Sequence, residues 1–348
     1  RKRLYRCQWQ LVGDGRRVVR VGRLDDGVNT LAPVVVGDAD NGQVADGRVI
    51  VQCGLDFGGV DVRSAADEIT PVKAIVLGVV EGVTEFLPVS STGHLLVTGK
   101  LLGVGTSDAT KEAADAYIVV IQGGAILAVL ILYWQRVWQV ILGLLGKDPG
   151  GRRLLIALVV AFLPAVAIGV PFQDDIKARL FAPWPIVAAW VVGGVTILLL
   201  VRSGRMRPGS GTGGITDITV WQAAIIGGAQ VLAMWPGTSR SLVTILAATF
   251  VGIGLSAAVE FSFLLGLITL GAASVVDLAD SGDLIVSTYG VAGPVIGFVA
   301  AAVSAFIAVK WMVGYLQTRS FAVFGWYRLV VAGIAAVLLL TGTISPTV

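Results

Sequence analysis

The chain has 348 residues, of which 55% are hydrophobic and 14% are charged, and its formal net charge is +3. Because soluble domains carry about 25% charged residues, most of this chain does not face water, which excludes an ordinary soluble domain. A net charge this small does not indicate a nucleic-acid partner, so the basic residues are interpreted loop by loop.

Residues 1–70 differ from the rest of the chain. They are rich in Gly, Val, Asp and Arg, hold both cysteines (Cys7 and Cys53), and contain no run able to span a bilayer. Such a composition is typical of GC-rich codons read in an unintended frame. We therefore expect an extension that is disordered or translated from upstream sequence, followed by a transmembrane domain over residues 71–348. A small soluble β-rich domain is the alternative, since the valine run at 34–36 has strand character.

The first apolar segments of the transmembrane part are short. Residues 72–88 and 95–103 are separated by Pro88 and Gly93. Crossing about 30 Å of hydrocarbon takes about 20 apolar residues, so neither segment is a complete span. This pattern predicts a broken or re-entrant helix pair.

Longer charge-free runs follow and predict a polytopic, all-α membrane protein. They cover residues 116–135, 154–173, 180–201, 218–239, 241–259, 284–309 and 329–348. Three loops rich in Lys and Arg are assigned to the cytoplasm by the positive-inside rule: 136–153, 202–216 and 310–328. Residues 174–183 and a short acidic loop are assigned to the outside, the latter carrying Asp277, Asp280 and Asp283. Spans over 218–235 and 241–259 then place both breaks toward the outside.

A second interruption echoes the first. Residues 229–254 contain an apolar segment, then Trp-Pro-Gly, then a short apolar segment, and PGTSRS at 236–241 resembles PVSSTG at 88–93. Glu81 precedes one break and Gln230 the other. Paired interrupted helices in two halves of a membrane protein indicate an inverted repeat with a site between them.

Glu81 and Glu85 lie four residues apart, on one face of the predicted helix. A carboxylate at the bilayer centre costs about 2.5–3.5 kcal/mol on insertion scales. The pair therefore needs a metal ion, an arginine or water as a partner.

The residues after Pro88 are predicted to start the next helix. Free N–H groups at such a start attract phosphate, with Ser90, Ser91 and Thr92 at the cap and first turn. His94 follows Ser91 by three residues, which suits a base acting on the serine hydroxyl. There are two alternatives. Ser90 and Thr92 only cap the helix, or His94 only packs against its neighbours.

Arg240 is a lone cation in the run from 218 to 259. Its planar guanidinium matches phosphate, and a buried arginine in a membrane is a functional candidate. A purely structural clamp on Glu81 or Glu85 is the alternative. The residues around Arg240 add hydroxyl donors and a close backbone approach: Thr238, Ser239, Ser241 and Gly237.

Together the two breaks fit phosphoryl transfer on a polyanion. The two carboxylates are expected to hold a divalent cation (Mg²⁺ or Ca²⁺), and Arg240 is expected to neutralise transition-state charge. Ser91 then attacks or positions water, with His94 as the base. The residues thus assigned to catalysis are Glu85, Ser91, His94 and Arg240.

Four motifs resemble the undecaprenyl-diphosphate phosphatase family, also called the bacitracin-resistance family. They are EGVTEFLPVSSTGHLL (81–96), VIQGGAILAVL (120–130), PGTSRS (236–241) and EFSFLLG (260–266). The resemblance covers residues 71–348, whereas residues 1–70 have no counterpart. After the Ser-Arg-Ser triplet many members have glycine, whereas this chain has Leu242, whose apolar side chain is expected to narrow the backbone approach and to leave activity intact.

The resemblance implies an enzyme of the bacterial plasma membrane with an inverted-repeat fold. Its substrate is undecaprenyl diphosphate within the bilayer, and its product is the monophosphate carrier of cell-wall synthesis. It further implies a site open to the periplasm, dependence on a divalent cation, a tendency to form homodimers, and resistance to bacitracin. The matching residues are Glu81, Glu85, Ser90 to His94, and Pro236 to Ser241.

Two alternatives were weighed. Lipid phosphatases of the acid-phosphatase type need two histidines, and this chain has only His94. A transporter or flippase for polyprenyl phosphates would share the broken helices and buried charges, but would need no nucleophile such as Ser91.

Overall fold

The computed structural model describes five strands between residues 5 and 60, and then residues 69–105, 108–204, 206 and 213–344. The chain divides into two units, Arg1–Ala65 and Ala66–Val348.

The first unit contains short antiparallel pairings. A three-stranded sheet has the order β1-β2-β3, and β4 pairs with β5. Strand β3 includes two valines of the run that indicated strand character. The other residues up to 68 lie outside the described part, so the origin of this region and the domain boundary at 71 stay predictions. The bounds are β1 Tyr5–Leu11, β2 Arg17–Arg23, β3 Ala32–Val35, β4 Leu55–Asp56 and β5 Gly59–Val60.

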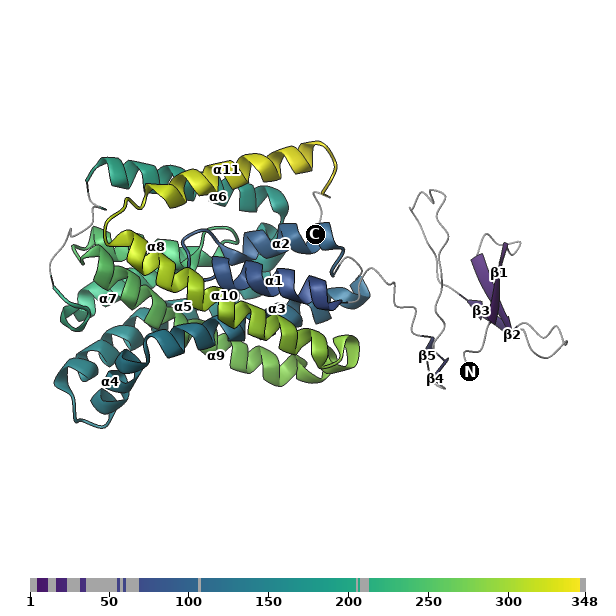
Figure 1. The fold of residues 1–348 in the computed structure, drawn as a ribbon, viewed down its shortest axis with the longest axis horizontal. Coiled ribbons are helices and arrows are strands. Elements are labelled where there is room, and N and C mark those ends of the chain that lie inside the picture. Colours follow the sequence, from purple (N-terminus) through teal and green to yellow (C-terminus); the bar gives the residue numbers. More distant parts are fainter. Residues whose placement is uncertain are drawn as a thin grey trace. The chain divides into compact units, whose positions relative to one another are not determined.

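The described part of the second unit is all-helical (Figure 1). Its helices are α1 Pro71–Thr84, α2 Ser91–Leu102, α3 Asp108–Leu132, α4 Trp134–Leu144, α5 Pro149–Leu180, α6 Pro183–Arg202, α7 Val220–Gln230, α8 Arg240–Phe250, α9 Leu255–Tyr289, α10 Ala292–Leu316 and α11 Ala322–Leu340, with 3-10 turns η1 Ile215–Asp217 and η2 Val231–Met234.

Six of these helices are long and apolar enough to cross a membrane. The spans lie in α3, α5, α6, α9, α10 and α11. Many large apolar side chains on them are exposed in the isolated chain, among them Ile131, Leu199 and Ile307. Such an apolar outer surface suits contact with lipid tails, so the chain is a multi-pass membrane protein.

Local signals explain where several helices begin and end. Thr70 accepts a hydrogen bond from the Lys73 amide, and Pro71 occupies the first turn of α1. Thr219 and Gln222 form a reciprocal capping box at the start of α7. Helix α2 ends at Gly103, whose φ of 64° is the left-handed conformation that favours glycine.

Small residues let the helices that surround the two breaks pack closely. A Cβ on Gly78 or Gly82 of α1 would overlap the backbone of α10 at Gly297 or Ala301. Close packing through glycine is usual in membranes, where apolar burial does not favour helix over lipid. Helix α1 thus packs against α10, α3 against α10 and α9, α5 against α7, and α6 against α11. Figure 1 shows α6 and α11 side by side.

Three boundaries differ from the prediction. The acidic residues expected in an outer loop belong to α9, which ends at Tyr289, and α5 continues to Leu180 through the segment 174–180. The prediction used charge to end a helix, but a helix satisfies its own backbone hydrogen bonds and continues beyond the hydrocarbon.

The third difference concerns the second break. Residues 218–235 and 241–259 were predicted to cross the membrane, but α7 and α8 have 11 residues each. At 1.5 Å per residue, each is about 16 Å long and too short to cross. The first break matches its prediction better, because α1 and α2 are short helices on either side of Pro88.

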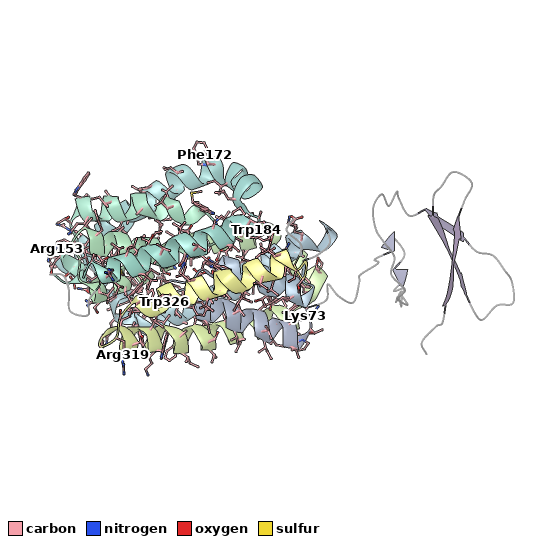
Figure 2. All side chains as sticks on the ribbon, turned by 90° about the horizontal axis from the view of Figure 1, so that it is seen from above. Lys73, Arg153, Phe172, Trp184, Arg319 and Trp326 are labelled. Atoms are coloured by element: carbon pink, nitrogen blue, oxygen red, sulfur yellow. The ribbon has the colours of Figure 1, made fainter. Side chains whose placement is uncertain are left out.

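Two basic residues of the loops lie at the same end of the helices, as the loop analysis expects. In Figure 2, Arg153 and Arg319 lie near one end of the helices and Lys73 near the opposite end. Arg153 and Arg319 come from two of the three segments assigned to the same side of the membrane. Arg328, counted among the loop cations, instead lies within α11 and is fully buried.

Candidate functional site

The two breaks meet inside the helical unit. The Ser241 hydroxyl, at the start of α8, donates a hydrogen bond of 3.0 Å to the Leu87 carbonyl in the first break. Ser241 is fully buried and Leu87 nearly so. The first turns of α2 and α8 therefore lie close together, although about half of the transmembrane chain separates them in sequence.

Glu85 joins these two helix starts. Its Oε2 accepts a hydrogen bond of 2.5 Å from the hydroxyl of Ser91, the first residue of α2. Its Oε1 accepts one of 3.4 Å from Nη2 of Arg240, the first residue of α8. The side chains of Arg240 and Glu85 are only 10% and 9% exposed, so solvent screens this ion pair weakly.

Arg240 is held from several sides. Its Nη1 donates to the Ser262 carbonyl at 2.9 Å, and its guanidinium carbon lies 5.4 Å from the centre of the Phe86 ring. A Cβ on Gly266 would overlap the guanidinium, so this glycine leaves the space that the arginine occupies. The buried Nε atom has no hydrogen-bond partner. Arg240 is therefore fixed in place with donor capacity left over.

Both helix starts share an uncommon backbone geometry. Ser90 and Ser239, the residues before α2 and α8, have φ of 75° and 73° with ψ of 103° and 115°. Non-glycine residues in sparsely populated regions cost about 1–3 kcal/mol and gather at functional sites.

This match also corrects the sequence register. When PVSSTG is written above PGTSRS, Ser91 stands opposite Ser239. In the structure, Ser90 is instead equivalent to Ser239, and Ser91 to Arg240. The same separation aligns Glu81 with Gln230. The break before α8 is one residue longer after its proline, which a six-residue pattern could not reveal.

The start of α2 has anion-binding character. The first amides of a helix lack intrahelical acceptors, and no side chain caps those of α2. At α8, Ser239 accepts a hydrogen bond of 3.4 Å from the Leu242 amide. Two helix starts and a guanidinium thus converge on one place.

His94 does not contact Ser91 through any hydrogen bond that the structure describes. Its Nδ1 lies 2.6 Å from the Ser90 carbonyl, and because a carbonyl can only accept, this nitrogen carries the proton. Its Nε2 lies 2.9 Å from the Tyr327 hydroxyl. The Trp190 ring is 5.1 Å away, centre to centre. In this geometry the hydroxyl of Ser91 bonds the Glu85 carboxylate rather than the His94 ring.

Two further polar residues are buried with free atoms. Glu81 is 1% exposed and its Oε2 has no hydrogen-bond partner, and Gln230 is 4% exposed with both amide atoms unpartnered. Buried polar atoms normally have partners, so free ones are candidates to contact an ion, a water molecule or a ligand.

The donor set fits a hard divalent cation. The described residues contain no group of three or more His, Cys, Asp or Glu side chains able to hold a metal ion. Mg²⁺ needs fewer protein ligands, since it is commonly bound by one or two carboxylates together with substrate phosphates. Glu81 and Glu85 supply two.

The remaining predicted binding residues divide into two groups. Thr92 and Thr238 are half-buried, so their hydroxyls are accessible in part. Ser239 and Ser241 are buried and bonded to each other at 3.0 Å, which suits a role in shaping the break. Gly237 has φ of 92°, a conformation that favours glycine.

Several residues around the cluster were missed. Tyr327 and Arg328 of α11, Trp190 of α6 and Ser262 of α9 reach it from distant parts of the chain. Arg328 carried a usable signal, because it is the only charged residue from 320 to 348. The other three belong to residue types that occur throughout the chain, so their role depends on the fold.

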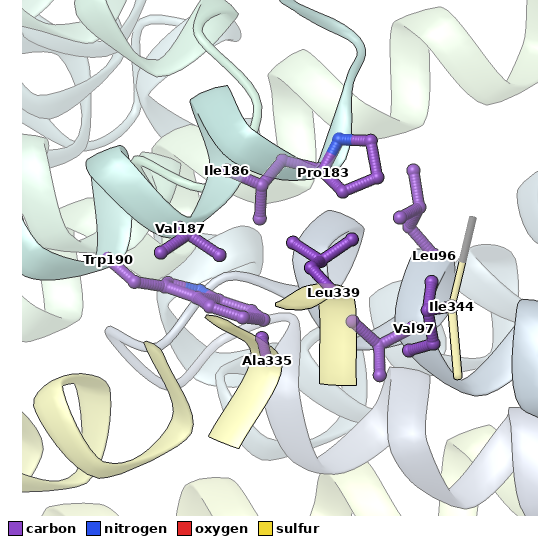
Figure 3. Close-up of a pocket in the computed structure, with 9 residues that line it drawn as sticks. All are labelled: Leu96, Val97, Pro183, Ile186, Val187, Trp190, Ala335, Leu339 and Ile344. Carbon is purple, nitrogen blue, oxygen red and sulfur yellow. The ribbon is translucent and has the colours of Figure 1, made fainter. Parts of the chain in front are cut away.

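A small pocket lies beside the cluster (Figure 3). Trp190 belongs to its wall and also packs against His94. The pocket is apolar throughout and lies between α2, α6 and α11, lined by Leu96, Val97, Pro183, Ile186, Val187, Trp190, Ala335, Leu339 and Ile344.

Comparison with known proteins adds independent information. Residues 74–334 match the model of the family described as bacitracin resistance protein BacA. The chain is 43% identical over 272 residues to an undecaprenyl-diphosphatase of Deinococcus radiodurans, covering 78% of this chain and 96% of that protein. It is 42% identical over 257 residues to the one of Sorangium cellulosum, covering 74% and 82%. It is also 42% identical over 266 residues to undecaprenyl-diphosphatase 2 of Rhodospirillum rubrum, covering 76% and 93%.

Proposed function

Because this chain belongs to the bacitracin resistance protein BacA family, we propose that the cluster around Glu85 is its catalytic site. The chain is a membrane-embedded undecaprenyl-diphosphatase, which removes the terminal phosphate of undecaprenyl diphosphate and regenerates the monophosphate carrier. The observation that carries the assignment of the site is the contact of Glu85 with both Ser91 and Arg240.

Ser91 is the nucleophile in this proposal. Its hydroxyl proton passes to Glu85 while its oxygen attacks the terminal phosphorus. The bond between that phosphorus and the bridging oxygen breaks, and undecaprenyl phosphate leaves. Water then attacks the phosphoserine, Glu85 returns its proton to the Ser91 oxygen, and inorganic phosphate leaves.

Arg240 and the two helix starts bind the diphosphate. The guanidinium and the free first amides of α2 place donors around the phosphoryl oxygens, where charge develops in the transition state. Glu85 keeps Arg240 and Ser91 oriented before substrate arrives. Thr92 and Thr238 are the hydroxyls accessible enough to add direct contacts.

Glu81 and Glu85 would hold the divalent cation together with the substrate phosphates. The free Oε2 of Glu81 supports this assignment. Such an ion neutralises phosphate charge and orients the diphosphate.

For His94 we propose a positioning role in place of the base predicted from the sequence. Its Nδ1–H bonds the Ser90 carbonyl, so it holds the residue before α2 in its left-handed conformation. Tyr327 fixes the other side of the ring. We assign the proton transfer from Ser91 to Glu85 and treat His94 as a residue that positions the start of α2.

The arrangement of helices supports an inverted repeat with two re-entrant pairs. Helix α1 packs against α10 in the first comparison, and α7 packs against α5 in the same way. The equivalent helices α3 and α9 contact each other, and so do α6 and α11, as a two-fold axis between the two halves requires. The matching backbone of Ser90 and Ser239 lies at equivalent points of the two halves. In this proposal the first pair enters from the outside and the second from the cytoplasm.

A site that opens to the periplasm of a bacterial inner membrane is proposed from the family resemblance. Homodimer formation remains a prediction from the family resemblance.

The test is phosphate release from undecaprenyl diphosphate by the purified protein in detergent. Ser91→Ala and Glu85→Gln are expected to remove nearly all turnover. Acid quenching followed by peptide mass spectrometry is expected to detect phosphate on Ser91. If quenched enzyme carries phosphate on another residue, the assignment of the nucleophile is wrong. A transporter would bind the lipid but release no phosphate.

A further inference from the structure

Among the described residues, Arg328 is a fully buried cation to which the proposed reaction assigns no role. It lies in α11, is 0% exposed, and donates hydrogen bonds to three backbone carbonyls. Nη1 reaches Pro88 at 3.2 Å, and Nη2 reaches Gly237 at 2.7 Å and Ala189 at 3.0 Å. One guanidinium thus contacts the first break, the second break and α6.

These acceptors explain why an arginine stands here. Wherever a helix is interrupted in a membrane, carbonyls lose their intrahelical donors and need others. The carbonyls of Pro88 and Gly237 are of this kind, since both lie in the breaks. A guanidinium carries five N–H donors in a planar fork, so one side chain satisfies both breaks at once.

Arg328 is not held by a carboxylate. Its described hydrogen bonds all go to backbone carbonyls, unlike those of Arg240, which include one to the Glu85 carboxylate. An unpaired buried charge in a membrane is costly, and it persists only where the surroundings compensate for it. Here the carbonyl dipoles of the two breaks compensate for the charge of Arg328. The breaks need the donors of this arginine, and the arginine needs the carbonyls of the breaks.

The neighbouring helix is shaped to admit this side chain. A Cβ on Gly193 of α6 would overlap the guanidinium carbon and two of its nitrogens. Gly193 is buried, and because it has no side chain, the Arg328 guanidinium occupies the space beside it. On the same turn of α11, Tyr327 contacts His94.

We propose that Arg328 is a positioning residue that holds both breaks in register, so that Ser91 and Arg240 meet at Glu85. It acts through the carbonyls of Pro88 and Gly237, each three residues before its helix, α2 or α8, begins. This inference rests on the proposed function for its activity readout, but not for its structural one.

The first experiment replaces Arg328 by Gln and Lys. Both variants are expected to lose activity about 100-fold, mainly in kcat, because a shift near 1 Å in a catalytic group costs that much. Lysine keeps the charge but has no planar fork to bridge two carbonyls. Arg319→Gln is the matched control, since Arg319 is an exposed arginine just before α11 begins. Its activity is expected to equal that of the unaltered protein.

Hydrogen–deuterium exchange supplies a readout that general loss of stability does not mimic. In Arg328→Lys, exchange is expected to rise at the amides of residues 89–93 and 237–242 together. It is expected to stay unchanged in α9 and α10. A rise across all helices, or a rise at one break alone, would overturn the positioning role.

The second experiment displaces the guanidinium of Arg328 without replacing this residue. Gly193→Ala places a methyl group where the guanidinium lies, and it is expected to reproduce the loss of kcat and the exchange at both breaks. Gly333→Ala is its control, because a Cβ on Gly333 of α11 meets nothing within 4 Å.

The outcomes separate the two proposals. An unaltered protein that releases no phosphate contradicts the proposed function, while coupled exchange at both breaks still supports the role of Arg328. Full activity in Arg328→Lys and Gly193→Ala, with normal exchange, contradicts the role of Arg328 alone.

Discussion

Ser91 and Arg240 contact the two oxygens of one carboxylate, that of Glu85, although they open two different helices. The hydroxyl and the guanidinium are therefore brought together by a residue that belongs to neither helix. The proposed nucleophile, base and phosphate-binding cation form one connected group in this arrangement.

Replacing Glu85 by Gln removes the acceptor for the Ser91 proton and the partner of Arg240. We expect kcat to fall by about 100-fold to 10,000-fold, the range for loss of general base catalysis. Steady-state phosphate release measures it. Glu112→Gln is the control, since Glu112 is an exposed carboxylate at the start of α3. A Glu85→Gln enzyme with normal kcat would contradict the assignment of the base.

Glu81→Gln tests the cation site. Because amide oxygen is a weaker ligand than carboxylate, we expect the variant to need a higher Mg²⁺ concentration for half-maximal activity, while saturating Mg²⁺ restores much of kcat. Titration with Mg²⁺ after treatment with a chelator measures this shift. An unchanged titration curve would show that Glu81 does not bind the cation.

Gly266→Ala alters Arg240 without replacing it. The added methyl group would overlap the guanidinium, so kcat/KM is expected to fall by about 10-fold to 100-fold through misplacement of the phosphate-binding group. Gly271→Ala is the matched control on the same helix, because its Cβ would meet nothing within 4 Å. Equal kinetics for the two variants would mean that Arg240 tolerates displacement.

Tyr327→Phe removes the hydrogen bond to Nε2 of His94 and keeps the ring. We expect a loss of activity of about 5-fold to 10-fold, the size of one hydrogen bond of roughly 1 kcal/mol. If Tyr327 acts through His94, the variant His94→Ala with Tyr327→Phe is no less active than His94→Ala alone. Additive losses in this double-mutant cycle would show that Tyr327 acts independently.

Ser241→Ala tests the bond between the breaks. It removes the hydrogen bond to the buried Leu87 carbonyl and leaves that carbonyl unsatisfied, so we expect a loss of about 1–3 kcal/mol in stability. Thermal unfolding in detergent measures it as a lower Tm. Ser203→Ala serves for comparison, because the exposed Ser203 bonds only its own helix. A Tm equal to that of Ser203→Ala would contradict a structural role for Ser241.

The sequence by itself determined the membrane-protein class, the positions of the two breaks and the candidate site residues. These features depend on local information: apolar run length, prolines at breaks, and charges where the bilayer penalises them. Glu85, Ser91 and Arg240 are therefore candidates that their own neighbourhoods indicate. The same local reasoning misjudged where α5 and α9 end, because leaving the hydrocarbon does not end a helix.

Only the tertiary structure decided which of these groups touch. Whether Ser91 bonds Glu85 or His94 depends on side-chain directions at a helix start, and a spacing of three residues does not distinguish the two. Arg328 illustrates the limit most clearly, since its partners are backbone carbonyls, which every residue has and no sequence pattern marks. Such contacts arise from the packing of α11 against α6 and the two breaks, so they follow from the fold as a whole.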